Sequence, residues 1–550
     1  MRQALLRPAL RFMVLALASG VAASLGAQAA RVPGTVVIAT GGDPTLPIPY
    51  VGPPTSQNAD VADQLFLRFG VLRPTVRTTG DDALLPMLAK SWKRTDSLTL
   101  VFELDPRARW HDGAPVTAHD AAFTWSIAQN PKINNNLPDI ESLAAVEEIG
   151  PRTVRVRFKR AFAEQLFRFA FGFQPLPSHL LEKLAPEAIA TSDFATHPIG
   201  NGPYRWARRV PGQLVELRAD STFFAGRPAI SRVMFRVAPD AAARLNLLLS
   251  GDLDVMDNIP AVNLPQVAAL PDMRMVRVAS NVLAYALFNA RSATDPGAPN
   301  RFFADVRVRE AMTLALDRAA MASNVFGAGT AVPDAAQSLL WSWMSGGTIR
   351  GASANSARAR VLLAAAGWRD SDGDGVLDKG GAPFRIVVIY NEQSANRTKL
   401  AIQSQAAWKA VGVQADLQPS PGSKWFDMHN KGQFDVDFTG ANQDASPSSL
   451  IEAWSCTSSN LPGSLNVAHW CDPTFDRLVR AAVTSRGAAG NWRAVLDRMA
   501  NQHPAAFLAA PPPVAAVHTR LDNALIMPVR QWLYLWQWHI RPGAAIARDR

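Results

Sequence analysis

The segment RWHDGAPVTAHDAAFTW, residues 109–125, contains two histidines and two aspartates within a span of ten positions. Imidazole and carboxylate groups are the residue types that bind metal ions and transfer protons. A helical zinc site places its two histidines four residues apart, as in HExxH. His111 and His119 are eight residues apart, and the residues between them are typical of a turn. We therefore interpret His111-Asp112 and His119-Asp120 as scaffold rather than as a metal or catalytic site.

A second acidic stretch, DSDGDGVLDKGG at 370–381, resembles a calcium-binding loop. Asp370, Asp372, Asp374 and Asp378 match ligand positions 1, 3, 5 and 9 of such a loop, but Gly381 stands where the bidentate Glu belongs. We favour an acidic turn before the next strand and keep calcium as the alternative. No metal site or cofactor is otherwise predicted.

Motifs of covalent and phosphate chemistry are missing from the sequence. It contains no G-x-S-x-G, no Walker or G-x-G-x-x-G loop, and no Cys-His pattern of a thiol hydrolase. A secreted hydrolase needs a nucleophile beside a base, and nothing in the sequence places such a pair. We therefore expect no enzymatic activity and keep a secreted hydrolase as the alternative from another class.

Local patterns predict the elements that carry these residues. LTLVFEL at 98–104 alternates like a half-buried strand, and Thr117 followed by Asp120 is typical of a capped helix start. Two strand–helix–strand units are expected, one from the strand 233–239 and one from the strand 384–390. Their apolar strands indicate buried parallel sheets, and their separation indicates two α/β lobes. Between them, Asp305 is the expected cap of a helix that ends near Gly327.

Charge and export signals narrow the class of protein. The net charge of +10 comes from scattered basic residues without a Lys/Arg run, so a nucleic-acid partner is not expected. Residues 1–29 combine Arg2, Arg7 and Arg11 with an apolar stretch and an Ala-Gln-Ala site, which predicts a cleaved signal peptide and a periplasmic location. The only cysteines, Cys456 and Cys471, are expected to form one disulfide in that compartment.

Six phrases in a fixed order then carry a family resemblance. They are LPMLAKSWKRTDSLTLVFELDPRARWHDGAPVTAHDAAFTW, HPIGNGPYRW, FRVAPDAAARLNLLLSGDLDVM, YALFNA, DVRVREAMTLALDRAAM and LLAAAGWRDSDGDG. The sequence resembles, over roughly residues 36–545, the family 5 extracellular solute-binding proteins, the peptide- and nickel-type receptors of ABC importers. The resemblance implies a bilobal flytrap fold of the α/β class with an extra subdomain inserted in the first lobe.

The resemblance also implies domain boundaries. Lobe I is expected to combine residues 30–60, 198–280 and 511–550, the inserted subdomain to span 61–197, and lobe II to span 281–510. The stretch at 109–125 then belongs to the insert, away from a ligand in the cleft between the lobes.

The nearest branch of the family is the dipeptide-binding one. There an Asp directly after a Thr-Gly pair binds the peptide ammonium, but Ala441 follows Thr439-Gly440 here. Asn442 and Asp444 are the possible substitutes. The resemblance further implies these ligand contacts: Gly41, Gly42 and Asp43 in the loop after the first strand, Phe438 as an aromatic platform, Trp425 as a wall, and Arg397 as a carboxylate-binding cation.

The implied function is to capture a small solute, most simply a peptide, and to deliver it to ABC permease subunits as a monomer. A metal chelate, an opine or a sugar derivative is the alternative solute, and a receptor that only signals is another alternative.

Overall fold

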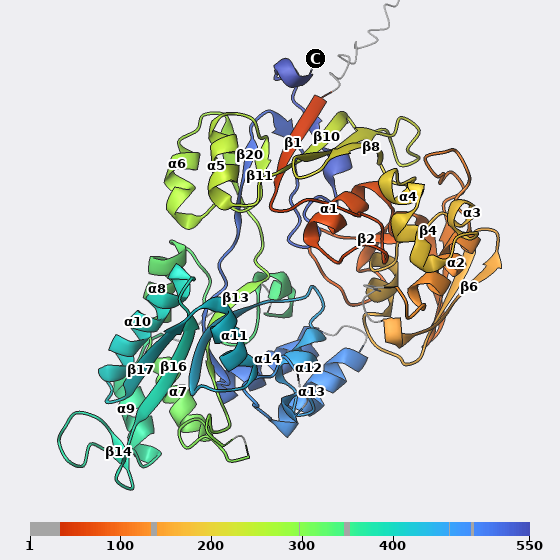
Figure 1. Ribbon diagram of the computed structural model, residues 1–550. Coiled ribbons are helices and arrows are strands. Elements are labelled where there is room, and N and C mark those ends of the chain that lie inside the picture. Colours follow the sequence, from red (N-terminus) through yellow and green to blue (C-terminus); the bar gives the residue numbers. More distant parts are fainter. Residues whose placement is uncertain are drawn as a thin grey trace, which may run out of the picture.

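The computed structural model describes residues 34–549 except 134–139, 296, 346–352, 461–462 and 486–488. The predicted signal peptide lies outside the described residues. Within the described chain, no helix has the length and apolar character that crossing a membrane requires. Most of the strands fall into three large sheets, which form separate parts of the molecule in Figure 1, and the described residues also form three two-stranded sheets, β2-β3, β14-β15 and β21-β22.

The first sheet has seven strands in the order β12-β20-β11-β1-β10-β9-β8. Its central strand β1, Gly34–Thr40, is buried along its whole length and pairs in parallel with both β10 and β11. The helices α5, Ala241–Leu249, and α6, Leu264–Ala268, belong to the same part of the chain. The other strands are β8 (Tyr204–Val210), β9 (Leu214–Ala219), β10 (Ile230–Val237), β11 (Val255–Met256), β12 (Met273–Arg277) and β20 (Val514–His518).

The second sheet has four antiparallel strands in the order β4-β5-β7-β6. They are β4 (Ala89–Asp96), β5 (Thr99–Leu104), β6 (Leu143–Gly150) and β7 (Thr153–Phe158). Around it lie α1 (Ser56–Leu65), β2 (Gly70–Leu72), β3 (Leu84–Pro86), α2 (Ala118–Ala128), a π-helix η2 (Phe167–Phe171), α3 (Ser178–Leu181) and α4 (Asp193–Thr196). The strand predicted at 98–104 is confirmed as β5.

The third sheet has five strands in the order β17-β16-β18-β13-β19. They are β13 (Val282–Phe288), β16 (Arg385–Asn391), β17 (Gln414–Ser420), β18 (Val436–Asn442) and β19 (Ala505–Ala509). Its helices are α7 (Val306–Leu314), α8 (Arg318–Phe326), α9 (Ser356–Ala365), α10 (Ala395–Lys409), α11 (Gly422–Asn430), α12 (Ser449–Trp454), α13 (Pro473–Thr484) and α14 (Ala489–Gln502).

Both predicted strand–helix–strand units are confirmed. β10, α5 and β11 form the first, in which both strands flank β1, and β16, α10 and β17 form the second, with parallel pairing along its length. Asp305 caps α7 as predicted, because its side chain accepts a hydrogen bond from the backbone N–H of Arg307. The single helix expected from there to Gly327 is instead two helices, because Asp317 caps a second one, α8.

The assignment of segments to sheets supports the predicted domain boundaries, which remain a proposal. Strands between 34–40, 204–277 and 514–518 build the first sheet, strands between 89 and 158 the second, and strands between 282 and 509 the third. The last segment returns to the first sheet through Arg520, whose buried guanidinium pairs with Asp254 at 2.8 Å and with Asp549 at 2.6 Å.

Candidate functional site

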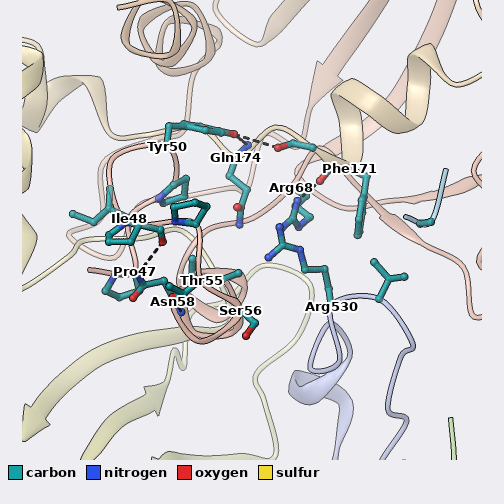
Figure 2. Close-up of a pocket in the computed structure, with 18 of the residues that line it drawn as sticks. Pro47, Ile48, Tyr50, Thr55, Ser56, Asn58, Arg68, Phe171, Gln174 and Arg530 are labelled. Carbon is teal, nitrogen blue, oxygen red and sulfur yellow. Dashed lines mark hydrogen bonds between the residues drawn. The ribbon is translucent and has the colours of Figure 1, made fainter. Parts of the chain in front are cut away.

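Two adjoining cavities lie where the first sheet, the segment around the second sheet and the third sheet meet. We name them the proline-side cavity, of about 310 Å³, and the strand-side cavity, of about 390 Å³. The proline-side cavity is lined by residues of 47–62, by Arg68, by residues of 167–174, and by segments near 444 and 530; Figure 2 draws most of them. The strand-side cavity is lined by residues at the end of β1, in α1, and near 257, 281, 443 and 531. Both share Ser56, Asp444, Ala445, Val529 and Arg530.

The wall of the proline-side cavity is the run TLPIPYVGPP at 45–54. Each proline holds its φ near −65°, and the run turns at 48–52, where the Gly52 N–H donates to the Ile48 carbonyl at 3.1 Å. Asn58 fastens the run to α1, because its side chain accepts from the Leu46 N–H at 3.1 Å and donates to the Pro53 carbonyl at 3.0 Å. The Tyr50 hydroxyl accepts from the Gln174 N–H at 2.6 Å and fastens the middle of the run. These hydrogen bonds hold the wall against α1 and against the segment of Gln174.

Arginines dominate the polar lining of the proline-side cavity. Arg68 is 4% exposed, pairs with Asp63 at 2.5 Å and lies over the Phe171 ring at 4.7 Å. Arg530 lies across from the proline wall, on the same side as Arg68 (Figure 2), with its Nε 3.8 Å from the Asp63 carboxylate. Arg168 comes from the π-helix η2, and its Nη1 lies 3.9 Å from the Asp444 carboxylate. This cavity offers cations beside apolar and aromatic surface.

Carboxylates dominate the strand-side cavity. Asp60 of α1, Asp257 after β11 and Asp444 after β18 line it together. Burial raises the pKa of Asp60 to about 8, the charges of Asp63 and Asp257 add to the rise, and Arg530 opposes it. An acid with that pKa is mostly neutral at pH 7 until a cation approaches it.

A family model of bacterial extracellular solute-binding proteins, family 5, matches residues 83–460. The chain belongs to this family. The oligopeptide-binding protein AppA of Bacillus subtilis is 25% identical over 468 residues, which are 82% of each chain. The periplasmic murein peptide-binding protein MppA of Escherichia coli is 24% identical, again over 82% of each chain.

Solved structures of similar proteins confirm the bilobal flytrap fold with an inserted subdomain. The CtaP substrate-binding protein of Listeria monocytogenes has a TM-score of 0.76 at 20% identity, covering 93% of this chain and 100% of that one. The AppA structure from Bacillus subtilis, in complex with a nonapeptide, has a TM-score of 0.68 at 24% identity and covers 92% of this chain and 99% of that one.

Of the three residues predicted as ligand contacts in the loop after β1, one lines a cavity and two do not. Gly41 lines the strand-side cavity. Gly42 lines neither cavity and lies against the Gln57 side chain. Asp43 is held by Arg209 at 2.6 Å and by the Gly212 N–H at 2.8 Å, and the Arg209 guanidinium lowers its pKa. Its carboxylate is thereby committed to joining two loops of the first sheet.

The aromatic and cationic residues predicted in lobe II lie outside both cavities. Phe438 has no exposed surface and packs against Trp408 in the core of the third sheet, which leaves no face for a solute. Trp425 and Arg397 are brought together, with the guanidinium 4.4 Å from the ring, and the Trp425 indole donates to the buried Asp437 at 2.9 Å. Neither lines the proline-side or the strand-side cavity.

Of the two residues predicted as substitutes for the missing acid, only one lines the cavities. Ala441 and Asn442 end β18 and pair with Leu283 and Val282 of β13, and neither lines the two cavities. Asp444, two residues further on, lines both and is half-exposed. Asp60, Asp257, Arg168 and Arg530 escaped the sequence analysis, because they stand on four separate segments without a shared motif. The dense prolines of 44–54 were the one available signal.

Neither His111 nor His119 lines the proline-side or the strand-side cavity. The buried His111 ring bridges two backbone groups, the Gly200 N–H at 3.1 Å and the Gly202 carbonyl at 3.0 Å, and its burial lowers its pKa to about 4. The exposed His119 has carboxylates of Glu182 and Glu148 within 3.3 Å, which raise its pKa. Asp120 accepts the Thr117 N–H at 2.8 Å, as its predicted capping role requires.

The acidic loop at 370–381 forms a turn before the hairpin β14 (Asp378–Lys379) and β15 (Ala382–Pro383). Asp370, Asp372 and Asp374 are exposed, with carboxylate oxygens within 4.8 Å of one another. Each accepts a backbone N–H of the loop itself. Asp378 accepts instead from Ser371 at 2.6 Å and lies outside this group. The turn is confirmed, and calcium binding stays untested.

Cys456 and Cys471 are joined by a disulfide, as predicted.

Proposed function

We propose that the protein is the exported substrate-binding component of an ABC importer and that it captures a peptide or peptide-like solute in the two adjoining cavities. The observation that carries the proposal is that these cavities lie between the first and third sheets and present charged groups of both signs beside apolar walls. A peptide needs both kinds of partner for its termini and its side chains. The peptide-binding names of the relatives support the same solute class.

Family 5 also includes a structure from Campylobacter jejuni in complex with Ni(L-His), with a TM-score of 0.70. The residues described around the two cavities include no His or Cys side chain. Without imidazole or thiolate ligands, a nickel ion would be held mainly by a chelator that it brings with it. We place a chelate second for that reason. A binding role without catalysis, a periplasmic location and a monomeric state complete the proposal.

Native mass spectrometry of protein purified from the periplasm, without refolding, tests the solute class directly. We expect retained peptides of mixed sequence, released on denaturation. Asp444→Asn should weaken binding of the retained peptides roughly tenfold or more, because the charged acceptor of a charge-assisted hydrogen bond is lost.

The matched control is Asp497→Asn on α14, a carboxylate 67% exposed that only faces Arg493 at 3.9 Å. It should leave affinity unchanged. A retained metal chelate, or tight binding of sugars and no peptide, would contradict the proposed solute class.

A further inference from the structure

A buried carboxylate lies between the segment around the second sheet and the loop that follows β18. Glu164 is 2% exposed and precedes the π-helix η2 by three residues. Its Oε1 accepts the Thr78 hydroxyl at 2.5 Å, from the same segment. Its Oε2 accepts the hydroxyls of Ser446 and Ser448. Three hydroxyl groups thus donate to one acid, and a carboxylate is the acceptor that binds such donors most strongly.

The two serine hydrogen bonds cross from one part of the molecule to another. Ser446 and Ser448 lie between β18 of the third sheet and α12, whereas Glu164 belongs to the segment around the second sheet. A backbone hydrogen bond crosses at the neighbouring residue, where the Ala163 N–H donates to the Val483 carbonyl of α13 at 2.9 Å. Side-chain and backbone hydrogen bonds therefore join the same two parts at adjacent positions.

Both sides of this contact continue into the lining of the cavities. Phe167 and Phe171 of η2 line the proline-side cavity. On the other side, the Ser446 N–H donates to the Asp444 carboxylate at 2.8 Å, and Asp444 lines both cavities. A change in the separation of the two parts therefore changes the cavities, and it also makes or breaks the hydrogen bonds from the serines to Glu164.

We propose that Glu164 is a latch whose hydrogen bonds to Ser446 and Ser448 hold the closed arrangement of the two parts and break when the parts separate to admit a solute. The inference rests on the proposed function and adds to it a role in solute affinity for the segment around the second sheet. The latch favours closure because the hydroxyls are fixed donors to an ionised acceptor in a site from which water is excluded.

A latch of this kind acts on every solute alike. It changes the fraction of the protein that is closed, and the apparent affinity of each solute scales with that fraction. Loss of a side chain that touches the solute, such as Asp444, instead weakens binding by a factor that depends on the chemistry of the solute. Fold-changes measured with two different solutes therefore separate the two roles.

Hydrogen exchange of the solute-free protein tests the latch without any ligand. The Ala163 N–H exchanges only when its hydrogen bond to the Val483 carbonyl opens, so its exchange rate reports the separation of the two parts. Mass spectrometry with fragmentation that resolves single amides measures this rate. The melting temperature of each variant shows that it is folded.

The test variant is Ser446→Ala/Ser448→Ala, which removes both crossing donors and leaves Glu164 in place. We expect the Ala163 amide to exchange about tenfold or more faster in this variant than in wild type, because hydrogen bonds to a charged acceptor are lost only from the closed arrangement. The matched control is Ser449→Ala, since the Ser449 hydroxyl donates to the Ser446 carbonyl at 2.9 Å within the same loop. It should leave the exchange rate unchanged.

Calorimetry with tetra-alanine and Ala-Phe-Ala-Phe then tests the link to solute affinity. The double serine variant should bind both peptides more weakly by the same factor, about tenfold, and Ser449→Ala should stay within about twofold of wild type. Glu164→Ala should give the same loss, and its combination with the serine variant should add nothing further, because all of these changes remove one contact. Asp444→Asn should weaken the two peptides unequally.

The possible failures are distinguishable. An unchanged Ala163 exchange rate in the double serine variant would overturn the latch, whether or not any peptide binds. Faster exchange with unchanged affinity for both peptides would leave Glu164 as a structural contact only, and unequal losses for the two peptides would make the serines solute contacts; either result would overturn the proposal. Failure of wild type to bind either peptide would count against the proposed function, and the exchange rates would still decide the latch.

Discussion

Burial of the His111 ring opposes its protonation. The ring is 7% exposed, and burial lowers its pKa from 6.5 to about 4. Because the unfolded chain binds the proton at higher pH than the folded chain, stability is lost as pH falls from 6.5 to 4. The shift corresponds to roughly 3 kcal/mol at the acid end of that window.

We therefore expect denaturant unfolding of wild type to show this acid-side loss, and His111→Gln to lack it. His119→Gln is the control, since the pKa of His119 is raised by Glu182 and its small contribution is lost as pH rises. His111→Gln and His119→Gln should both leave solute affinity within a few-fold. An unchanged pH dependence in His111→Gln would show that other groups carry the acid sensitivity.

At the scale of elements, the disulfide closes the segment between α12 and α13. Cys456 and Cys471 are 15 residues apart, and the residue after Cys471 is Asp472, which caps α13 and pairs with Arg498 at 2.6 Å. Trp454, at the end of α12, packs against Trp470 within the enclosed segment. The cross-link restricts the unfolded chain, for which a loop of this length is worth roughly 3 kcal/mol.

The double variant Cys456→Ser/Cys471→Ser should lose about that free energy of unfolding. Intact-mass alkylation without reductant should find no free thiol in wild-type protein from the periplasm. Two alkylated thiols, or a variant as stable as wild type, would contradict the structural role of the disulfide.

At the scale of the whole molecule, one buried arginine joins the two ends of the described chain. Arg520 donates to Asp254, to Asp549 and to the Thr35 carbonyl, and the Asp549 carboxylate accepts the Thr35 N–H at 2.8 Å. Arg520 is 2% exposed and both acids have no exposed side-chain surface. Its removal leaves two buried carboxylates without their shared cation.

Arg520→Met should therefore lower the free energy of unfolding by about 3–5 kcal/mol in a denaturant titration. The matched control is Arg493→Met, whose side chain is 66% exposed and faces Asp497 at 3.9 Å, where the loss should stay under about 1 kcal/mol. A loss below about 1 kcal/mol in Arg520→Met would mean that the remaining contacts of the carboxyl-terminal segment suffice.

A second long-range contact joins the inserted segment to the third sheet. The buried Glu164 carboxylate accepts from Thr78 at 2.5 Å and from the hydroxyls of Ser446 and Ser448. These serines are two and four residues after Asp444 in the chain. Glu164 therefore joins the segment around the second sheet to the loop after β18.

The sequence by itself determined what depends on neighbours in the chain. Apolar periodicity and flanking turns placed β5 and both strand–helix–strand units, and Thr117 and Asp305 marked helix starts, because caps and strand faces are set within a few residues. The boundary between α7 and α8 was missed, although Asp317 could have indicated it. Six ordered phrases identified the family, since their order survives changes between them.

Only the tertiary structure decided which side chains share a cavity. Asp60, Asp257, Asp444 and Arg530 meet there from four well-separated parts of the chain, and no local pattern encodes such a meeting. The same holds for the charge of Asp43. The sequence predicted Asp43 as a ligand contact, but its carboxylate is bound by Arg209, 166 residues away in the chain. Phe438 was predicted as an aromatic platform for the solute, but in the structure its ring packs against Trp408 in the core. The burial and ion pairing of a charged side chain depend on the whole fold. Which charges face a solute can therefore be decided only from the tertiary structure.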